Sequence, residues 1–411
     1  MESSAVLLSP EDIDAMNRVR LSESDTFSEL VSLASLDPVR DLRFVNLSDV
    51  DFGGSDLRGF DFTGANLTRT NWFGAVYDES TNLAGANLDG AIGFVPSGRS
   101  RTAIDARTQL TSGIYQTTIR APATLEGVGV HSGLPASLTI EPAGVDQGIV
   151  FVRTGLDGGS RQVQAVASSV VATDFATVLG DGEGPLVSTA EHVLAAVRGV
   201  GLDNAIIRID GPEVPIMDGS AAAFVSLIDR VGLSTQSAAR RLIKVLKPIR
   251  VEIGDSFGEL RPYSQGFRVE VEFDFSNPAI GHQRYVVDVT PESFRLEIAS
   301  ARTFGLMEDV SRLWAAGFAL GASFENTIVF NDTGLLNRDG LRYADECARH
   351  KVLDVLGDFA LAGLPLIASI KTVRGGHKLN TAILTALLAD NTAWVIVEAG
   401  AGTIGKAGQL A

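Results

Sequence analysis

The sequence has 411 residues, with 34 Lys and Arg against 50 Asp and Glu and a formal net charge of −16. Such an acidic chain repels phosphate backbones, and it carries no basic stripe of the required length, so we expect no nucleic acid partner. Hydrophobic residues make up 45% and charged residues 20%, which is typical of a globular protein and excludes a disordered or fibrous one. The length predicts roughly two to three domains.

The single cysteine, Cys347, excludes an internal disulfide and a metal site built from cysteines alone. Any metal must therefore be bound by histidines and carboxylates. The first residues resemble neither a signal peptide nor a transit peptide, which predicts a cytoplasmic protein. The longest apolar run, about residues 359–370, is shorter than the roughly 20 residues that span a bilayer, so no transmembrane helix is expected.

Large apolar or aromatic residues recur every five positions from Leu42 to Tyr77, and after a slip of one position the pattern resumes at Leu83. A period of five fits neither a helix nor a strand, so each pentad must turn the chain and stack on a later one.

The stretch 41–92 resembles the pentapeptide-repeat family, which implies a right-handed quadrilateral β-solenoid, here residues 37–95. Because an open solenoid end exposes backbone and core, we expect residues 1–36 to form a helical cap and residues 96–111 a linker. Tethering of a protein partner, self-association and plain stabilisation all remain open as roles of the repeats.

From residue 113 the pattern changes to strands and helices. The expected strands are 115–125, 136–141, 149–152, 205–209, 242–253, 267–275 and 366–373, and the expected helices are 188–198, 220–231, 342–361 and 377–388. Because this order occurs twice, we predict an α+β module of two similar sheet-and-helix halves, residues 112–234 and 235–411. A ligand site is expected between the halves.

All five histidines lie in this C-terminal module. His350, Asp354 and Asp358 follow one another at intervals of four on a predicted helix, so they form one stripe of ionisable groups. Spacing alone favours a stripe that faces solvent. For Glu191-His192, a capped helix whose Glu faces solvent is as good an interpretation as a pair that lines a pocket. Alternatively, one His and one Asp from one half and one His from the other leave an open coordination position on zinc, with Glu191 as the base.

Five further motifs carry weaker signals. Gly127–Gly133 is glycine-rich but precedes no helix, which favours a tight β-turn over a phosphate loop. Pro215–Ser220 is interpreted as a structural turn that feeds a helix. Arg374–His377 places a cation and a histidine at a turn before a helix, which indicates an anion-binding or proton-transfer corner. His282 is expected in a solvated loop, and Cys347 as a packed helix residue.

Together these segments resemble one family, the zinc-dependent UDP-3-O-acyl-N-acetylglucosamine deacetylases of lipid A biosynthesis, over about residues 113–400. The matching stretches are 127–133 (GVGVHSG), 188–195 (STAEHVLA), 212–222 (PEVPIMDGSAA), 300–305 (SARTFG), 345–358 (DECARHKVLDVLGD) and 376–380 (GHKLN). The resemblance implies hydrolysis of the N-acetyl group of UDP-3-O-acyl-N-acetylglucosamine to a free amine and acetate, in an active site between the two halves.

The resemblance also implies a role for ten residues and one segment. The Zn²⁺ ligands are His192, His350 and Asp354. Glu191 is the general base, His377 the cationic general acid, Asp358 its carboxylate partner, and Thr303 helps to hold the oxyanion. Phe304, Lys351 and Arg374 contact the nucleotide end of the substrate. Residues 306–332, with Trp314, Phe318, Leu320 and Phe324, line a passage for the acyl chain.

Two alternatives remain. A zinc amidohydrolase for another acetylated sugar nucleotide would keep the ligands and lack the apolar passage. A non-catalytic scaffold protein would act through its solenoid, although the intact metal and proton-transfer positions argue against a decayed C-terminal module.

Overall fold

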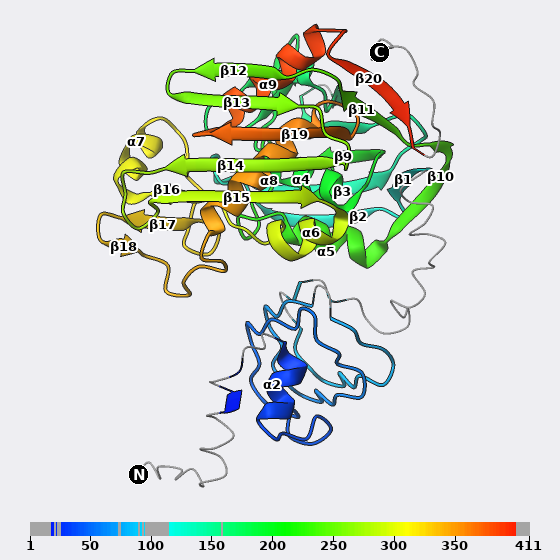
Figure 1. The fold of residues 1–411 in the computed structure, drawn as a ribbon, viewed down its shortest axis with the longest axis vertical. Coiled ribbons are helices and arrows are strands. Elements are labelled where there is room, and N and C mark those ends of the chain that lie inside the picture. Colours follow the sequence, from blue (N-terminus) through cyan, green and yellow to red (C-terminus); the bar gives the residue numbers. More distant parts are fainter. Residues whose placement is uncertain are drawn as a thin grey trace. The chain divides into compact units, whose positions relative to one another are not determined.

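The chain divides into two compact units, residues 1–106 and residues 107–411. The computed structural model (Figure 1) describes residues 18–19, 22, 26–72, 75–88, 91–92, 94, 115–157 and 159–399. Most of the expected cap, residues 1–36, and the whole expected linker, residues 96–111, lie outside the described residues, so both stay predictions. Among the described residues, no helix is long and apolar enough to cross a lipid bilayer.

The repeats of the N-terminal unit are joined by parallel β-bridges between residues 20 or 21 positions apart. These bridges are 46 to 66, 51 to 71, 56 to 76, 61 to 82, 66 to 87 and 71 to 92. Twenty residues are four pentads, and the spacing of 21 follows the one-position slip in the sequence. The repeats expected from the period of five are therefore present as stacked turns.

Large residues of the pentads pack into a core, and an Asp or Asn before them closes the turn. Phe52, Leu57 and Phe62 are fully buried. Asp51 and Asp61, directly before two of them, each accept a hydrogen bond from the backbone N–H two residues further on, at 2.7 and 2.8 Å. Asx side chains favour such turns, which explains why Asp or Asn recurs before the large residue.

Helix α2 (Phe27–Leu33) adds to the core of the repeats. The ring of Phe27 packs edge-on against Phe52 with the centroids 4.8 Å apart, and Val31 is buried. Aromatic pairs at this distance and angle are favourable beyond their burial. The helix lies within the segment predicted as a cap.

The first larger sheet of the C-terminal unit has five strands in the order β2-β3-β9-β4-β5. Their bounds are Ala123–Val128 (β2), Pro135–Pro142 (β3), Ala205–Ile209 (β9), Ile149–Leu156 (β4) and Gly159–Gln164 (β5). Strand β4 is parallel to β9, and the other neighbours are antiparallel. A small sheet of β6 (Val170–Ala172), β7 (Val178–Asp181) and β8 (Gly184–Val187) follows β5 in the chain.

The second larger sheet has seven strands, in which β19 pairs with β11, β13 and β14. Their bounds are Arg241–Val245 (β11), Ile249–Ile253 (β12), Ser256–Arg261 (β13), Phe267–Asp274 (β14), His282–Val289 (β15), Leu366–Val373 (β19) and Trp394–Glu398 (β20). Two of these strands, β14 and β19, lie where the sequence pattern predicts them.

Two expected strands are each broken into two. Residues 115–125 form β1 (Tyr115–Ile119) and β2, and residues 242–253 form β11 and β12. The breaks contain Pro122 and Pro248, which cannot donate a ladder hydrogen bond. His282 is exposed, as expected, but the loop expected around it is wrong, because His282 begins β15 and its Nε2 lies 3.4 Å from Glu272 Oε1.

Two smaller assemblies complete the strands. β1 pairs with β10 (Leu233–Ala239) as a two-stranded ribbon. β16 (Phe304–Leu306), β17 (Ile328–Asn331) and β18 (Gly334–Leu335) form a three-stranded sheet, and α7 (Val310–Ala315) lies between β16 and β17 in the chain. Residues 306–332, which run from the end of β16 through α7 to just beyond β17, are called the insert.

The helices of the unit have the bounds Glu191–Val200 (α4), Ala222–Val231 (α5), Pro291–Ser293 (α6), Glu346–Ala360 (α8) and His377–Ala389 (α9). Helices α4 and α8 are almost entirely buried, whereas α6 has no buried residue. Helix α8 packs against α4 and against β14 and β15, behind which it is visible in Figure 1. The mixed α+β fold is confirmed, and the contact between α4 and α8 joins the two segments that carry the predicted metal ligands.

Candidate metal centre and active site

The N-terminus of α4 brings Glu191 and His192 into the interior. Both side chains are buried, although the helix begins three residues later than predicted. Gly357 of α8 makes this possible, because a Cβ at that position would lie 2.1 Å from the Glu191 carbonyl oxygen. A glycine at this point allows the two helix backbones to approach closely.

Helix α8 supplies His350 and Asp354 from one face, as a spacing of four requires. The His350 Nε2 atom lies 3.3 Å and the His192 Nε2 atom 4.0 Å from Asp354 Oδ1. One ligand atom from each of the three residues lies within 4.8 Å of the others, and all three residues are buried. The solvated stripe considered from the sequence is therefore wrong for His350 and Asp354.

The donor atoms of these residues fit a divalent metal ion. Among the described residues, the buried His192 Nδ1 atom has no hydrogen-bond partner. The His350 Nδ1 atom donates to the Ala301 carbonyl oxygen at 3.0 Å, which leaves the Nε2 lone pair free to face Asp354. Such a bond to a carbonyl orients metal-binding histidines and selects their tautomer. Two neutral imidazoles and a carboxylate form a common N/O ligand set.

The pKa values of the three groups agree with this assignment. Burial, reinforced by the neighbouring His350, lowers the pKa of His192 to about 3, and burial also lowers the pKa of His350. Although burial opposes it, the Lys351 ammonium helps to hold the pKa of Asp354 below its usual range. At neutral pH the site therefore offers two neutral imidazoles and one carboxylate, the forms that bind metals.

A second polar cluster surrounds Asp358, one helical turn beyond Asp354. Its carboxylate accepts hydrogen bonds from His377 Nδ1 at 2.9 Å, from Asn380 Nδ2 at 2.8 Å and from Thr177 Oγ1 at 2.5 Å. The three donors come from α9 and from the segment before β7. A buried carboxylate with several donors is held in one orientation.

His377 connects this cluster to Glu191. The His377 Nε2 atom lies 3.7 Å from Glu191 Oε1, and the backbone N–H of Thr177 donates to Glu191 Oε2 at 3.0 Å. Burial raises the pKa of Glu191 to about 7, a shift that the His377 cation only partly opposes. Burial also disfavours the charged form of His377, but the Asp358 and Glu191 carboxylates raise its pKa to about 10. The pair therefore combines a carboxylate with a near-neutral pKa and an imidazolium.

Lys351 and Phe304 lie beside the metal ligands. The Lys351 ammonium donates to Asp354 Oδ2 at 2.9 Å and lies 5.4 Å from the centroid of the Phe304 ring. Its pKa is raised despite burial, because Asp354 stabilises the charged form. The centroids of the Phe304 and His350 rings are 6.4 Å apart. Two of the three residues expected at the nucleotide end of the substrate, Phe304 and Lys351, therefore border the candidate metal ligands.

Thr303 lies two residues after Ala301, whose carbonyl oxygen accepts the hydrogen bond from His350. Its backbone N–H donates to the Gly219 carbonyl oxygen at 2.8 Å, and its own carbonyl accepts from the N–H of Ile328 at 2.8 Å. Arg374, by contrast, is exposed and adopts a left-handed backbone conformation with φ 51°. No hydrogen bond or ion pair joins its guanidinium to another residue in the described part of the chain, so the structure does not bring it to the other site residues.

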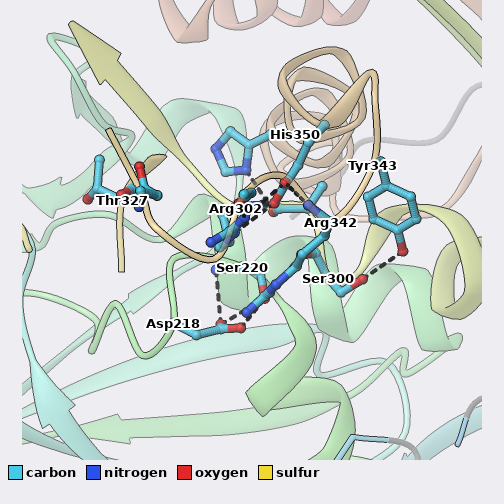
Figure 2. A network of polar contacts seen from close by, with 12 residues as sticks. Asp218, Ser220, Ser300, Arg302, Thr327, Arg342, Tyr343 and His350 are labelled. Carbon is cyan, nitrogen blue, oxygen red and sulfur yellow. Dashed lines mark hydrogen bonds and ion pairs between the residues drawn. The ribbon is translucent and has the colours of Figure 1, made fainter. Parts of the chain in front are cut away.

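A buried ion pair that the sequence did not suggest supports the segment 300–303 (Figure 2). Arg302 Nε donates to Glu346 Oε1 at 2.8 Å, and both side chains are almost fully buried. Arg342 extends the network, donating to Asp218 Oδ2 and to the Ser300 carbonyl, each at 2.8 Å. This network fixes the backbone whose Ala301 carbonyl orients His350.

Two further residues of the site escaped sequence reasoning. Thr177 carries no motif and reaches Asp358 across 181 positions in the chain. Asn380 is part of the stretch GHKLN, and its position three residues after His377 on one helix was the available signal. Of the weaker motifs, residues 127–133 end β2 and form the turn that leads to β3, and Ser220 Oγ accepts from the N–H of Ala222 at the start of α5.

The insert presents the apolar residues expected of it. Trp314, Leu320 and Phe324 are each more than half exposed. Phe318 packs against His131 and Phe175, with ring centroids 5.3 and 5.0 Å apart. Exposed large apolar side chains gathered on one segment indicate a surface that contacts an apolar partner or ligand.

Comparison with known proteins identifies the family. Residues 116–389 match the family model described as UDP-3-O-acyl N-acetylglycosamine deacetylase, and residues 41–71 match pentapeptide repeats in 8 copies. The UDP-3-O-acyl-N-acetylglucosamine deacetylases of Brucella ovis and Brucella canis are each 52% identical to this chain over 286 residues, which is 69% of this chain and 99% of each relative. The enzyme of that name from Brucella melitensis is 51% identical. The chain belongs to the UDP-3-O-acyl N-acetylglycosamine deacetylase family and carries pentapeptide repeats in its N-terminal part.

Proposed function

We propose that this protein is a zinc-dependent hydrolase that removes the N-acetyl group of UDP-3-O-acyl-N-acetylglucosamine in lipid A biosynthesis. The observation that carries the proposal is the buried group His192, His350 and Asp354 next to the His377–Glu191 pair. Membership of the family and the names of its relatives support the substrate. The donor set supports zinc, which favours His and carboxylate ligands and keeps an open position in catalytic sites.

The residues of the chain divide the chemistry between them. A bound zinc ion would supply a Lewis acid that polarises the acetamide carbonyl and lowers the pKa of water. Glu191 would accept the proton of the attacking water, since its pKa near 7 suits a general base at neutral pH. His377, kept cationic by Asp358, would donate a proton to the departing nitrogen.

Further residues would hold the developing oxyanion and the rest of the substrate. The Thr303 hydroxyl would donate to the oxyanion that develops from the carbonyl. The Lys351 cation would attract the diphosphate of the nucleotide, and the Phe304 ring next to it would pack on the nucleotide end. Arg374 would join them only if its exposed side chain turns toward the substrate. The exposed apolar residues of the insert would line the passage for the acyl chain.

Two features of architecture also belong to the proposal. We infer that residues 37–95 form a right-handed quadrilateral β-solenoid, which the parallel bridges at 20 and 21 positions support. We infer further that residues 112–234 and 235–411 are two similar halves, supported by the two larger sheets with their helices between them. A protein partner or self-association through the solenoid remains an open role.

One experiment tests the function. The full chain is analysed for metal and assayed for release of acetate from UDP-3-O-acyl-N-acetylglucosamine and from UDP-sugars without the acyl chain. We expect about one zinc per chain, loss of activity on chelation with recovery on adding zinc, and preference for the acylated substrate. Equal turnover of other acetylated sugar nucleotides would favour the broader amidohydrolase. Absence of hydrolysis with any of them would favour the scaffold protein.

A further inference from the structure

Glu213 is a buried carboxylate that the proposed chemistry does not use. It is 2% exposed and lies in the loop after β9. Its oxygens accept three hydrogen bonds, from the backbone N–H groups of His131 and Ser132 at 2.9 and 2.7 Å and from Thr189 Oγ1 at 2.8 Å. Burying a carboxylate is costly without such donors. Glu213 is therefore tied to two separate segments.

One of these segments leads directly into α4. Thr189 lies two residues before Glu191 and has a left-handed backbone conformation, with φ 56°. The backbone N–H of Val214 donates to the Ser188 carbonyl oxygen at 3.0 Å, so the loop of Glu213 runs alongside this segment. The carboxylate thus has a fixed position relative to the residues proposed for metal binding and proton transfer.

The other segment is the turn Gly129–Gly133, which contacts the insert. The backbone N–H of Leu320 donates to the His131 carbonyl oxygen, and that of Gly321 donates to the Val130 carbonyl oxygen, both at 3.0 Å. The turn and the insert are therefore joined through their backbones, independently of side-chain identity.

Glycines make this backbone contact possible. A Cβ at Gly321 would lie 2.2 Å from the Gly129 carbonyl oxygen, and a Cβ at Gly133 would lie 3.2 Å from the Leu320 carbonyl carbon. Gly133 also has φ 65°, a conformation that other residues rarely adopt. Glycines in both the turn and the insert thus allow these two segments of the chain to approach closely.

We propose that Glu213 is a positioning residue that holds the insert at a fixed place relative to the N-terminus of α4 and thereby determines the preference for a long acyl chain. The inference rests on the proposed function, in which the insert lines the acyl passage. The metal ligands are held separately, by the contact of α4 with α8. Loosening the Glu213 contacts therefore displaces the passage and leaves the metal centre in place.

The test is Glu213→Gln in the full chain. An amide has one acceptor oxygen and an NH₂ group that cannot accept, so it cannot satisfy all three donors. We expect kcat/KM for a substrate with a long 3-O-acyl chain to fall about tenfold or more, mainly through KM, as an unsatisfied buried group would cause. With a 3-O-acetyl substrate, kcat/KM should stay near the wild-type value, and the metal content should be unchanged.

Two further variants make the test decisive. Glu141→Gln removes a partly exposed carboxylate on β3, which pairs with Arg208 at 3.0 Å. This control variant should leave kcat/KM for both substrates unchanged. Gly321→Ala disturbs the contact between the turn and the insert from the insert side. It should lower kcat/KM for the long-chain substrate as Glu213→Gln does, and it provides the test if Glu213→Gln does not fold.

Equal losses with the long-chain and short-chain substrates, or no loss with either, would overturn the positioning role. Failure of the proposed function has a different signature, because the unmodified protein would then hydrolyse neither substrate.

Discussion

Burial and neighbouring charges together determine the protonation state of each residue in the candidate metal centre. His192 and His350 are buried and neutral at pH 7, while Asp354 remains ionised through its contact with Lys351. Burial disfavours the charged form of His377 as well, but the Asp358 and Glu191 carboxylates outweigh it and raise the pKa of His377. Two histidines able to bind a metal and one histidine able to donate a proton thus lie within one buried region.

We expect His350→Ala and Asp354→Ala each to remove the bound metal and the activity. Each change takes away one of three ligands, and His350 also loses its bond to the Ala301 carbonyl. Metal analysis of the purified variants, with circular dichroism to verify folding, gives the answer. His282→Ala, at an exposed position on β15, is the matched control and should keep both metal and activity. Stoichiometric metal with normal turnover in the two ligand variants would contradict the site.

Glu191→Gln should keep the metal and the fold but lower kcat by roughly 10²-fold or more, the contribution typical of a general base. The amide preserves the shape of the side chain and can still accept from the Thr177 N–H through its oxygen, but it cannot take a proton. Steady-state kinetics at saturating substrate measure the effect. Turnover like that of the unmodified enzyme would exclude Glu191 from the reaction.

The raised pKa of His377 predicts the basic limb of the pH profile. With a pKa of about 10, His377 is protonated at neutral pH and loses its proton as the pH rises through that value. If it acts as an acid, kcat should therefore decline at high pH, and His377→Ala should lower kcat and abolish that limb. A variant that keeps the basic limb unchanged would exclude the role.

At the scale of elements, the close packing of α4 on α8 sets the distance between the ligands. Gly357→Ala places a methyl group against the Glu191 carbonyl, which must shift. We expect a loss of stability of about 1–3 kcal/mol, as for other overpacked positions, together with weaker metal binding. Thermal unfolding and metal titration measure the two effects.

Gly199→Ala is the matched control for this prediction. Gly199 lies in α4, and a Cβ there would meet the Phe294 ring, away from the metal ligands. This variant should lose stability and keep its metal affinity. If both variants lose affinity equally, the glycine in α8 has no particular role in spacing the ligands.

Sequence periodicity predicted the elements with a strong local signal and missed the rest. The bounds of β9 and β19 agree with those expected, because each strand contains several Ile or Val residues, which favour strands. Short strands such as β7 and β18 were not predicted, since so few residues carry too little alternation to mark a strand, and β20 was missed although residues 394–397 are apolar. Proline accounts for the two strands that were wrongly continued.

The candidate site could be predicted only as far as local spacing and family motifs reach. The interval of four between His350 and Asp354 is visible in the sequence, whereas the joining of these residues to His192 depends on the contact of two helices. The hydrogen bond from Thr177 to Asp358 and the ion pair of Arg302 with Glu346 connect positions far apart. No periodicity encodes such pairs.

At the scale of the whole molecule, the chain combines two units with separate cores. The repeat unit has its own cluster of buried aromatic and aliphatic residues, built around Phe52, Phe62 and Trp72. The C-terminal unit contains all five histidines of the sequence and all ten residues assigned to the site. Stability and chemistry can therefore be examined in each unit by itself.

We expect deletion of residues 1–111 to leave a folded, metal-loaded deacetylase. Because every predicted ligand and acid–base group lies after the deletion, turnover should stay within about tenfold of the full chain, a difference of about 1.4 kcal/mol in the barrier. The cut precedes β1, the first strand of the C-terminal unit, and so removes none of its sheets. Metal content, thermal unfolding and kcat/KM are compared between the two proteins. A truncated protein that retains its metal and has lost activity would indicate that the repeats complete the active site, and the independence of the two units would then be wrong.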